Sequence, residues 1–127
     1  MAESRQVAPP VVMSERIRAT PDEVFDFLVK PDKLIRWMGV EARIEPTPGG
    51  EFWLDVTGGD IARGRYEIVD RPNRVDFSWG WEGSDHVPPG SSTVSFVLRK
   101  DGDETVVELT HSGLPASDLD HRRGAAV

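Results

Sequence analysis

Two titratable residues, Glu15 and His111, stand out because Glu15 interrupts the apolar face of a predicted strand and His111 lies at the end of an inward-pointing row. Histidine titrates near neutral pH, so His111 could act as a hydrogen-bond donor or general base, or its hydrogen bonds could be purely structural. A carboxylate at Glu15 would suit acid–base chemistry if it were buried, but it would be an ordinary wet group if its strand lies at a sheet edge. Both residues are candidate catalytic groups with a structural alternative.

Aromatic side chains form a second candidate site. They recur at alternating positions and could line a pocket for a flat hydrophobic ligand, because ligand pockets are mostly apolar with few polar groups. Aromatic residues in this pattern can equally form a plain core, so both interpretations stay open at this point. The candidate ligand-binding residues are Trp37, Tyr66, Phe77, Trp79, Trp81, Phe96 and His111.

Other kinds of active site find no support in the residue pattern. The three histidines have no metal-ligand spacing with each other or with the carboxylates, so we expect no metal and no cofactor. The pairs Gly49-Gly50 and Gly58-Gly59 lack a phosphate-loop frame, Gly90-Ser91-Ser92 is not a nucleophile elbow, and no nucleophile–base pair is visible. The chain has no cysteine, which excludes disulfides and thiol nucleophiles. The balance favours binding over catalysis.

Length and charge indicate one acidic domain. The chain has 127 residues and a net charge of −7, which argues against nucleic acid or an anionic membrane as partner. Residues 1–10 are expected to form a flexible lead-in, and residues 11–127 a single domain. We find neither an apolar run long enough to span a membrane nor a signal peptide, so we expect a cytoplasmic protein.

A helical pair over residues 20–39 is the clearest predicted element. Thr20 suits the N-cap and Pro21 the first helical position, and Glu23 completes a capping box. Pro31 ends the first helix and opens a second short one before Gly39. The apolar face of that second helix is expected to carry Leu34, Trp37 and Met38.

Apolar residues alternate through the remaining segments, as they do in half-buried strands. The predicted strands are residues 11–18, 40–45, 51–56, 61–69, 75–81, 93–100 and 104–112. In the fourth strand, Tyr66 and Ile68 are expected to face inward. The fifth is expected near the centre of the sheet, with Phe77 and Trp79 buried. One strand, a helix pair and six strands at hairpin spacing predict an α+β fold with one antiparallel sheet and helices on one side.

A set of local motifs extends over most of the chain. They are Ala19-Thr20-Pro21 with Glu23-Val24-Phe25, Pro31-Asp32, Leu34, Arg36-Trp37 and Gly39, Pro48-Gly49-Gly50, Gly64 with Tyr66 to Val69, Phe77 with Trp79, and His111-Ser112-Gly113-Leu114-Pro115. Together they resemble the AHSA-type family, named for the activator of the heat-shock chaperone ATPase, within the START-like or SRPBCC superfamily. The resemblance implies a helix-grip, Bet v-like fold, in which a curved antiparallel sheet wraps a long C-terminal helix and encloses an apolar cavity.

The C-terminal end departs from the family pattern. Family members continue past the segment that matches His121 to Gly124 with a tryptophan and a long amphipathic helix, whereas this chain reads Ala125-Ala126-Val127. The resemblance therefore implies a truncated C-terminal helix, whether in a shortened piece, a degenerate copy, or a protein whose open face a partner covers. We expect exposed apolar rows on that face, and either a homodimer that covers them or a marginal, aggregation-prone monomer. These rows comprise Phe52, Leu54, Phe77, Trp79, Phe96 and Leu109.

The resemblance implies four functions. The leading one is to bind or carry a small hydrophobic or aromatic molecule in the apolar cavity of a START-like domain. The alternative is an enzyme similar to polyketide cyclases and aromatases, in which His111 or Glu15 would be essential. The others are a chaperone ATPase co-factor and a self-resistance protein that sequesters a natural product. The chaperone partner has weaker support, because the asparagine-rich tryptophan motif of the eukaryotic activators is absent.

Overall fold

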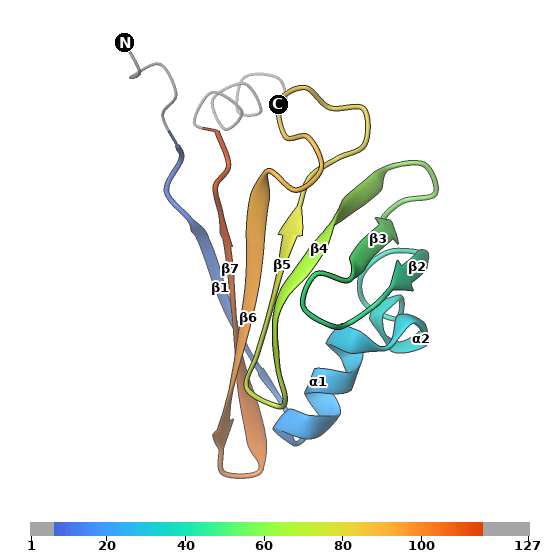
Figure 1. Ribbon diagram of the computed structural model, residues 1–127. Helices are drawn as coiled ribbons and strands as arrows, with labels where there is room; N and C mark the ends of the chain where they lie inside the picture. Colours follow the sequence, from blue (N-terminus) through green and yellow to red (C-terminus); the bar gives the residue numbers. More distant parts are fainter. Residues whose placement is uncertain (1–6, 116–127) are drawn as a thin grey trace.

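A seven-stranded antiparallel sheet curves around two short helices in the computed structural model, which describes residues 7–115 (Figure 1). The elements are β1 (Val11–Ile17), α1 (Pro21–Val29), α2 (Pro31–Leu34), β2 (Glu41–Ile44), β3 (Glu51–Asp55), β4 (Ile61–Asp70), β5 (Arg74–Trp79), β6 (Ser92–Asp101) and β7 (Glu104–Ser112). The predicted α+β class and element order are confirmed. The first part of the expected lead-in and the short C-terminal segment after residue 115 lie outside the described residues.

The strands follow the order β1-β7-β6-β5-β4-β3-β2, so β5 is the middle strand and β1 and β2 are the edges. The predicted central position of this strand is confirmed, and Phe77 and Trp79 are both buried. The strand ends at Trp79, two residues earlier than expected, and Trp81 makes only an isolated bridge to Ala62. Consecutive strands pair as hairpins except β1, which reaches across to β7.

The start of α1 follows the predicted capping box. The Glu23 amide donates to Thr20 Oγ1 at 3.2 Å, and the Thr20 amide donates to Glu23 Oε1 at 2.9 Å. Two backbone donors that a helix start leaves unpaired are thereby satisfied. Val24, Phe25 and Leu28 recur at helical spacing and are buried in the core, which fixes α1 on the inner side of the sheet (Figure 1).

Side chains from elsewhere in the chain cap the end of α1. Pro31 has no N–H, so the Phe27 carbonyl lacks its usual helical donor; the Trp37 indole Nε1 donates to it instead, at 3.0 Å. The next carbonyl, that of Leu28, accepts a hydrogen bond from the Tyr66 hydroxyl at 3.1 Å. The proline that stops the helix thus creates the acceptor that holds Trp37.

The second helix is shorter than predicted. It spans only Pro31–Leu34, so Trp37 lies in the turn that follows and does not share a helical face with Leu34. Leu34 is buried, whereas 48% of Trp37 is exposed. The predicted helical face therefore does not extend to Trp37, because the helix ends at Leu34.

A second correction concerns β4. Tyr66 pairs with Phe77 and Ile68 pairs with Asp76, so the register between β4 and β5 shifts between these two pairs. Such a bulge places an extra residue on one strand and reverses the inward and outward alternation beyond it. Ile68 is consequently exposed while Val69 packs against the core, opposite to the expected orientation.

The centre of the core is an aromatic stack. The Phe52 and Phe77 rings are stacked with centroids 4.0 Å apart, and the Tyr66 ring meets both edge-on. Phe52 belongs to β3, Tyr66 to β4 and Phe77 to β5. The stacked rings of Phe52 and Phe77 therefore connect β3 and β5 across β4, which lies between these two strands. At Gly64 of β4 even a Cβ atom would collide with the Ser78 carbonyl of β5, so only glycine fits there.

The apolar rows that were expected to lie open are covered. Phe52, Leu54, Phe77, Trp79 and Phe96 are all buried, in one cluster with the apolar faces of α1 and α2. The expectation of an open face was wrong for these five residues, because it did not count the helix pair among the elements that cover the sheet. Exposed apolar surface is found instead along β1, where the exposed large residues are Val11, Val12, Met13 and Ile17.

Candidate functional site

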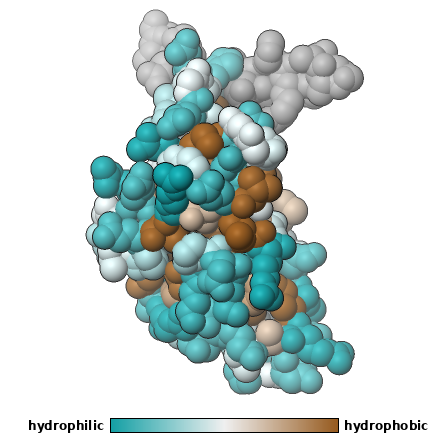
Figure 2. Space-filling model, turned by 90° about the vertical axis from the view of Figure 1, so that its right-hand side faces the viewer, coloured by the Kyte–Doolittle hydropathy of each residue, from teal (hydrophilic) through white to brown (hydrophobic). Residues whose placement is uncertain are grey.

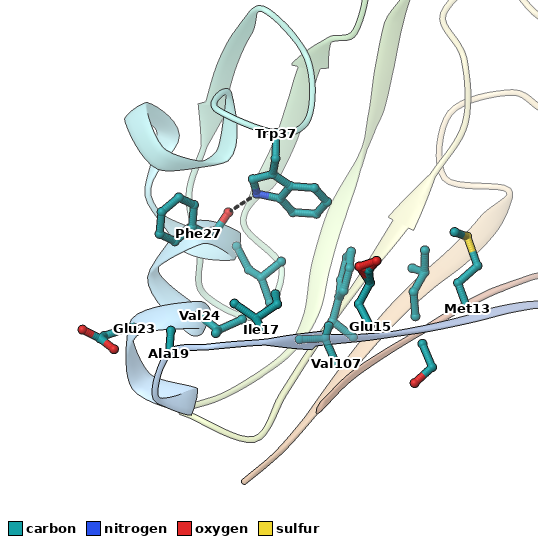
Figure 3. A pocket seen from close by; sticks show the side chains of 13 residues that line it. Met13, Glu15, Ile17, Ala19, Glu23, Val24, Phe27, Trp37 and Val107 are labelled. Carbon is teal, nitrogen blue, oxygen red and sulfur yellow. Dashed lines mark hydrogen bonds between the residues drawn. The ribbon is translucent and has the colours of Figure 1, made fainter. Parts of the chain in front are cut away.

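A cavity of about 410 Å³ lies between α1 and the part of the sheet made by β1, β7 and β6 (Figure 3). Its lining is almost entirely apolar. The side chains of its floor come from strands and those of its wall from α1 and the turn after α2. The principal lining residues are Met13, Glu15, Ile17, Val24, Phe27, Leu28, Trp37, Phe96, Val107 and Leu109.

Strand register explains the floor. Met13 lies opposite Leu109, and Glu15 lies opposite Val107, so these four side chains share one face of the β1–β7 pair. Phe96 of β6 pairs with the other side of Leu109 and extends the same face. Because β1 is an edge strand, with no described strand beyond it, its residues on this floor are exposed.

Trp37 forms a fixed part of the wall. Its ring meets Phe96 edge-on with centroids 5.8 Å apart and an interplanar angle of 88°. Its indole N–H is held by the Phe27 carbonyl, as the dashed line in Figure 3 shows. The side chain is nevertheless half exposed. An aromatic ring that is held at two points and still reaches solvent is a preorganised contact surface.

Glu15 occupies the middle of the floor and is exposed. Of the two alternatives for this residue, the structure places it at a wet edge strand. Within residues 7–115 its carboxylate has no hydrogen bond or ion pair. The other acidic lining residue, Glu23, is engaged in the capping box with Thr20.

The predicted ligand-binding residues divide into two groups. Trp37 and Phe96 line the cavity, and they are the two members of the set that meet there. The other members lie away from it, in the aromatic core and around Trp79, which contacts Trp81 and His111 edge-on. The members of this second group are Tyr66, Phe77, Trp79, Trp81 and His111.

His111 is held against Ser92, a pair that the sequence did not reveal. The Ser92 hydroxyl donates to the Trp79 carbonyl at 2.8 Å, and His111 Nε2 lies 2.9 Å from Ser92 Oγ. A carbonyl only accepts, so the single hydroxyl proton points to Trp79 and the imidazole N–H donates to Ser92. Burial lowers the pKa of His111, which favours this neutral form. The pair thus holds strands together and does not activate Ser92 as a nucleophile.

Several lining residues escaped the sequence-based prediction. Phe27 is not one of the α1 residues that are buried in the core. It lines the cavity wall because of the way in which the chain turns from β1 into α1. Val107 and Leu109 were recognised as one face of a strand, but nothing local indicated their facing residues on β1.

The described part of the chain contains no group of three His, Asp or Glu residues that could hold a metal. No helix of residues 7–115 is long and apolar enough to cross a membrane.

A family model and solved structures of other proteins both match this chain. The family model described as activator of Hsp90 ATPase homolog 1-like protein matches residues 18–126. The solution structure of an AHSA1-like protein from Rhizobium etli is 42% identical, with a TM-score of 0.61 and coverage of 93% of this chain and 76% of that one. CalU16 from Micromonospora echinospora is 28% identical, with a TM-score of 0.70 and coverage of 91% and 71%.

A more distant structure shares the fold alone. The Aha1 dimer from Colwellia psychrerythraea is 17% identical, with a TM-score of 0.72 and coverage of 84% of this chain and 77% of that one. No curated protein matches the chain.

Proposed function

This chain belongs to the activator of Hsp90 ATPase homolog 1-like family, and we propose that it binds a small, flat hydrophobic molecule in the cavity between α1 and strands β1, β7 and β6. The observation that supports this proposal is the cavity itself, which has a volume of about 410 Å³ and a nearly continuous apolar lining. Pockets for small molecules usually measure about 300–1,000 Å³ and combine such a lining with few polar groups.

The wall at Trp37 supports an aromatic or otherwise planar ligand. The ring stands nearly perpendicular to Phe96 and cannot swing away without losing its hydrogen bond to the Phe27 carbonyl. A ligand that packs against this ring does not have to order it first, so little conformational entropy is lost at this contact. Hydrophobic side chains also reach the surface of the face that carries α1, α2 and β2, where hydrophilic ones surround them (Figure 2).

Calorimetric titration with naphthylmethanol, a neutral planar probe, tests this proposal. We expect saturable binding, and we expect Trp37→Ala to weaken it about tenfold, because the ligand loses a large aromatic contact. The matched control is Trp53→Ala, since Trp53 lies outside the cavity lining and packs instead under the Arg43 guanidinium, 4.6 Å from the ring centroid. Circular dichroism confirms that both variants are folded. Equal affinity in wild type and Trp37→Ala would refute the site.

The other functions that the resemblance implies stay predictions. They are a polyketide-cyclase-like enzyme, a chaperone ATPase co-factor and a self-resistance protein. Structures that share the fold include an HSP90 activator from Plasmodium falciparum and the Aha1 dimer from Colwellia psychrerythraea. A homodimer was expected for this chain because inward aromatic residues would lie exposed on the concave face. These residues are buried within the chain, so their exposure no longer supports a dimer. The cytoplasmic location also stays a prediction.

A further inference from the structure

The charge of the cavity lining is one-sided. Among residues 7–115, Glu15 and Glu23 are the charged side chains of the lining, and no lysine, arginine or histidine of that range lines it. Glu23 is already engaged, because its Oε1 accepts from the Thr20 amide at 2.9 Å and lies 3.2 Å from Thr20 Oγ1. Figure 3 shows its carboxylate pointing away from the cavity, whereas that of Glu15 points inward, between the floor and Trp37. A bound molecule would therefore meet one uncommitted carboxylate.

No described residue on the floor compensates the charge of Glu15. Its neighbours on the same face of β1 are Met13 and Ile17, and the residue opposite it on β7 is Val107. The nearest cation along the strand, Arg16, lies on the opposite face and is paired with Asp101 at 2.7 Å and Glu104 at 3.3 Å. The carboxylate thus stands alone among apolar side chains, on a face where water reaches it.

We propose that the ligand of this cavity is a planar apolar molecule that carries a protonated amine, with the amine paired to the Glu15 carboxylate. This inference rests on the proposed function and specifies its ligand class. An ammonium group at this position would form a charge-assisted hydrogen bond, which is about twice as strong as a neutral one. The face of Trp37 would attract the same cation. An anionic ligand would instead be repelled by Glu15 and by a protein of net charge −7.

Glu15 also has a structural explanation, which the experiment must separate from the functional one. An inward-pointing charge on an edge strand prevents the strand from pairing with a second molecule. Glu15 lies on the edge strand β1 and could serve only this purpose. That role predicts self-association when the charge is removed, and it predicts no effect on the choice among ligands of different charge.

The test compares three probes of one shape at low ionic strength by calorimetry: naphthylmethylamine, naphthylmethanol and naphthoate. We expect wild type to bind the amine about tenfold more tightly than the alcohol, and the naphthoate most weakly. Glu15→Gln should remove the preference, so that the amine and the alcohol bind the variant with affinities within about twofold of each other. The matched control is Glu108→Gln, which makes the same change in net charge on the opposite face of β7 and should keep the full preference.

Three results would overturn the inference. The first is that the amine and the alcohol bind wild type equally. The second is that Glu15→Gln keeps the preference for the amine, and the third is that Glu108→Gln loses this preference to the same extent as Glu15→Gln. Self-association of Glu15→Gln in ultracentrifugation, with an unchanged preference for the amine, would assign the residue to edge protection. If the alcohol does not bind wild type at all, the proposed function fails. If it binds and Trp37→Ala weakens it, but the amine is not preferred, only the present inference fails.

Discussion

Tyr66 allows the packing around α1 to be tested directly, because it is the only tyrosine in the chain. Its ring lies in the aromatic core, and its hydroxyl donates to the Leu28 carbonyl at 3.1 Å. Burial raises the pKa of Tyr66 above its usual value, since the phenolate would be placed among apolar side chains. The perturbations are alkaline pH and the substitution Tyr66→Phe.

The magnitudes follow from these contacts. Tyr66→Phe leaves a buried carbonyl without its donor, and should lower the free energy of unfolding by about 1–3 kcal/mol at neutral pH. The folded state holds the Tyr66 proton to a higher pH than the unfolded chain does. The stabilisation by protonated Tyr66 is therefore complete below about pH 10 and is lost as the pH rises above that value. Relative to Tyr66→Phe, wild type should lose about 1.4 kcal/mol by about pH 11.

The assay is urea unfolding of both proteins at neutral and alkaline pH, together with the ultraviolet absorbance of the phenolate. Because one tyrosine gives the whole phenolate signal, ionisation should coincide with the loss of the circular dichroism spectrum. A phenolate signal with a midpoint near pH 10 in a protein that is still folded would refute the buried position of the hydroxyl. Parallel pH dependence in wild type and Tyr66→Phe would refute it as well.

Two further predictions concern the core and the His111–Ser92 pair. Phe77→Ala should cost about 3–5 kcal/mol in denaturant titration, because it removes the ring stacked on Phe52 at 4.0 Å; a loss below about 1 kcal/mol would contradict the central position of β5. The pKa of His111, measured by NMR titration of its imidazole, should lie below that of a free histidine because the ring is desolvated. Its contribution to stability should be complete above about pH 6.5 and fall as acid protonates the ring, which a series of urea titrations would detect; a normal imidazole titration with no change in stability would contradict this.

The elements were predictable because their signals are local. The capping box of Thr20 and Glu23 begins α1, and Pro31 ends it, whatever surrounds them. Strict alternation of apolar residues likewise marked seven strands, and the sharpest alternation, in β5, identified the middle of the sheet. Hydrogen bonding and burial act over a few neighbouring residues in these cases, so the sequence alone contains the information.

Orientation beyond an irregularity was not predictable. The register shift after Tyr66 reverses the alternation in β4, and the residue types of the strand do not fix where such a shift occurs. Ile68 was therefore assigned to the wrong face. The same limit applies to Trp37, whose position depends on a hydrogen bond to a carbonyl ten residues earlier and not on the helical periodicity around it.

The cavity and its chemistry were decided by tertiary structure. The sequence marked Glu15 as an anomaly on an apolar strand, and His111 as a candidate base and a candidate ligand-binding residue. Pairing of β1 with β7, strands at opposite ends of the chain, puts Glu15 on the cavity floor opposite Val107. Pairing of β6 with β7 brings His111 to Ser92 and away from that cavity. Residue types are properties of the sequence, but which of them meet depends on contacts between distant segments, and those exist only in the folded sheet.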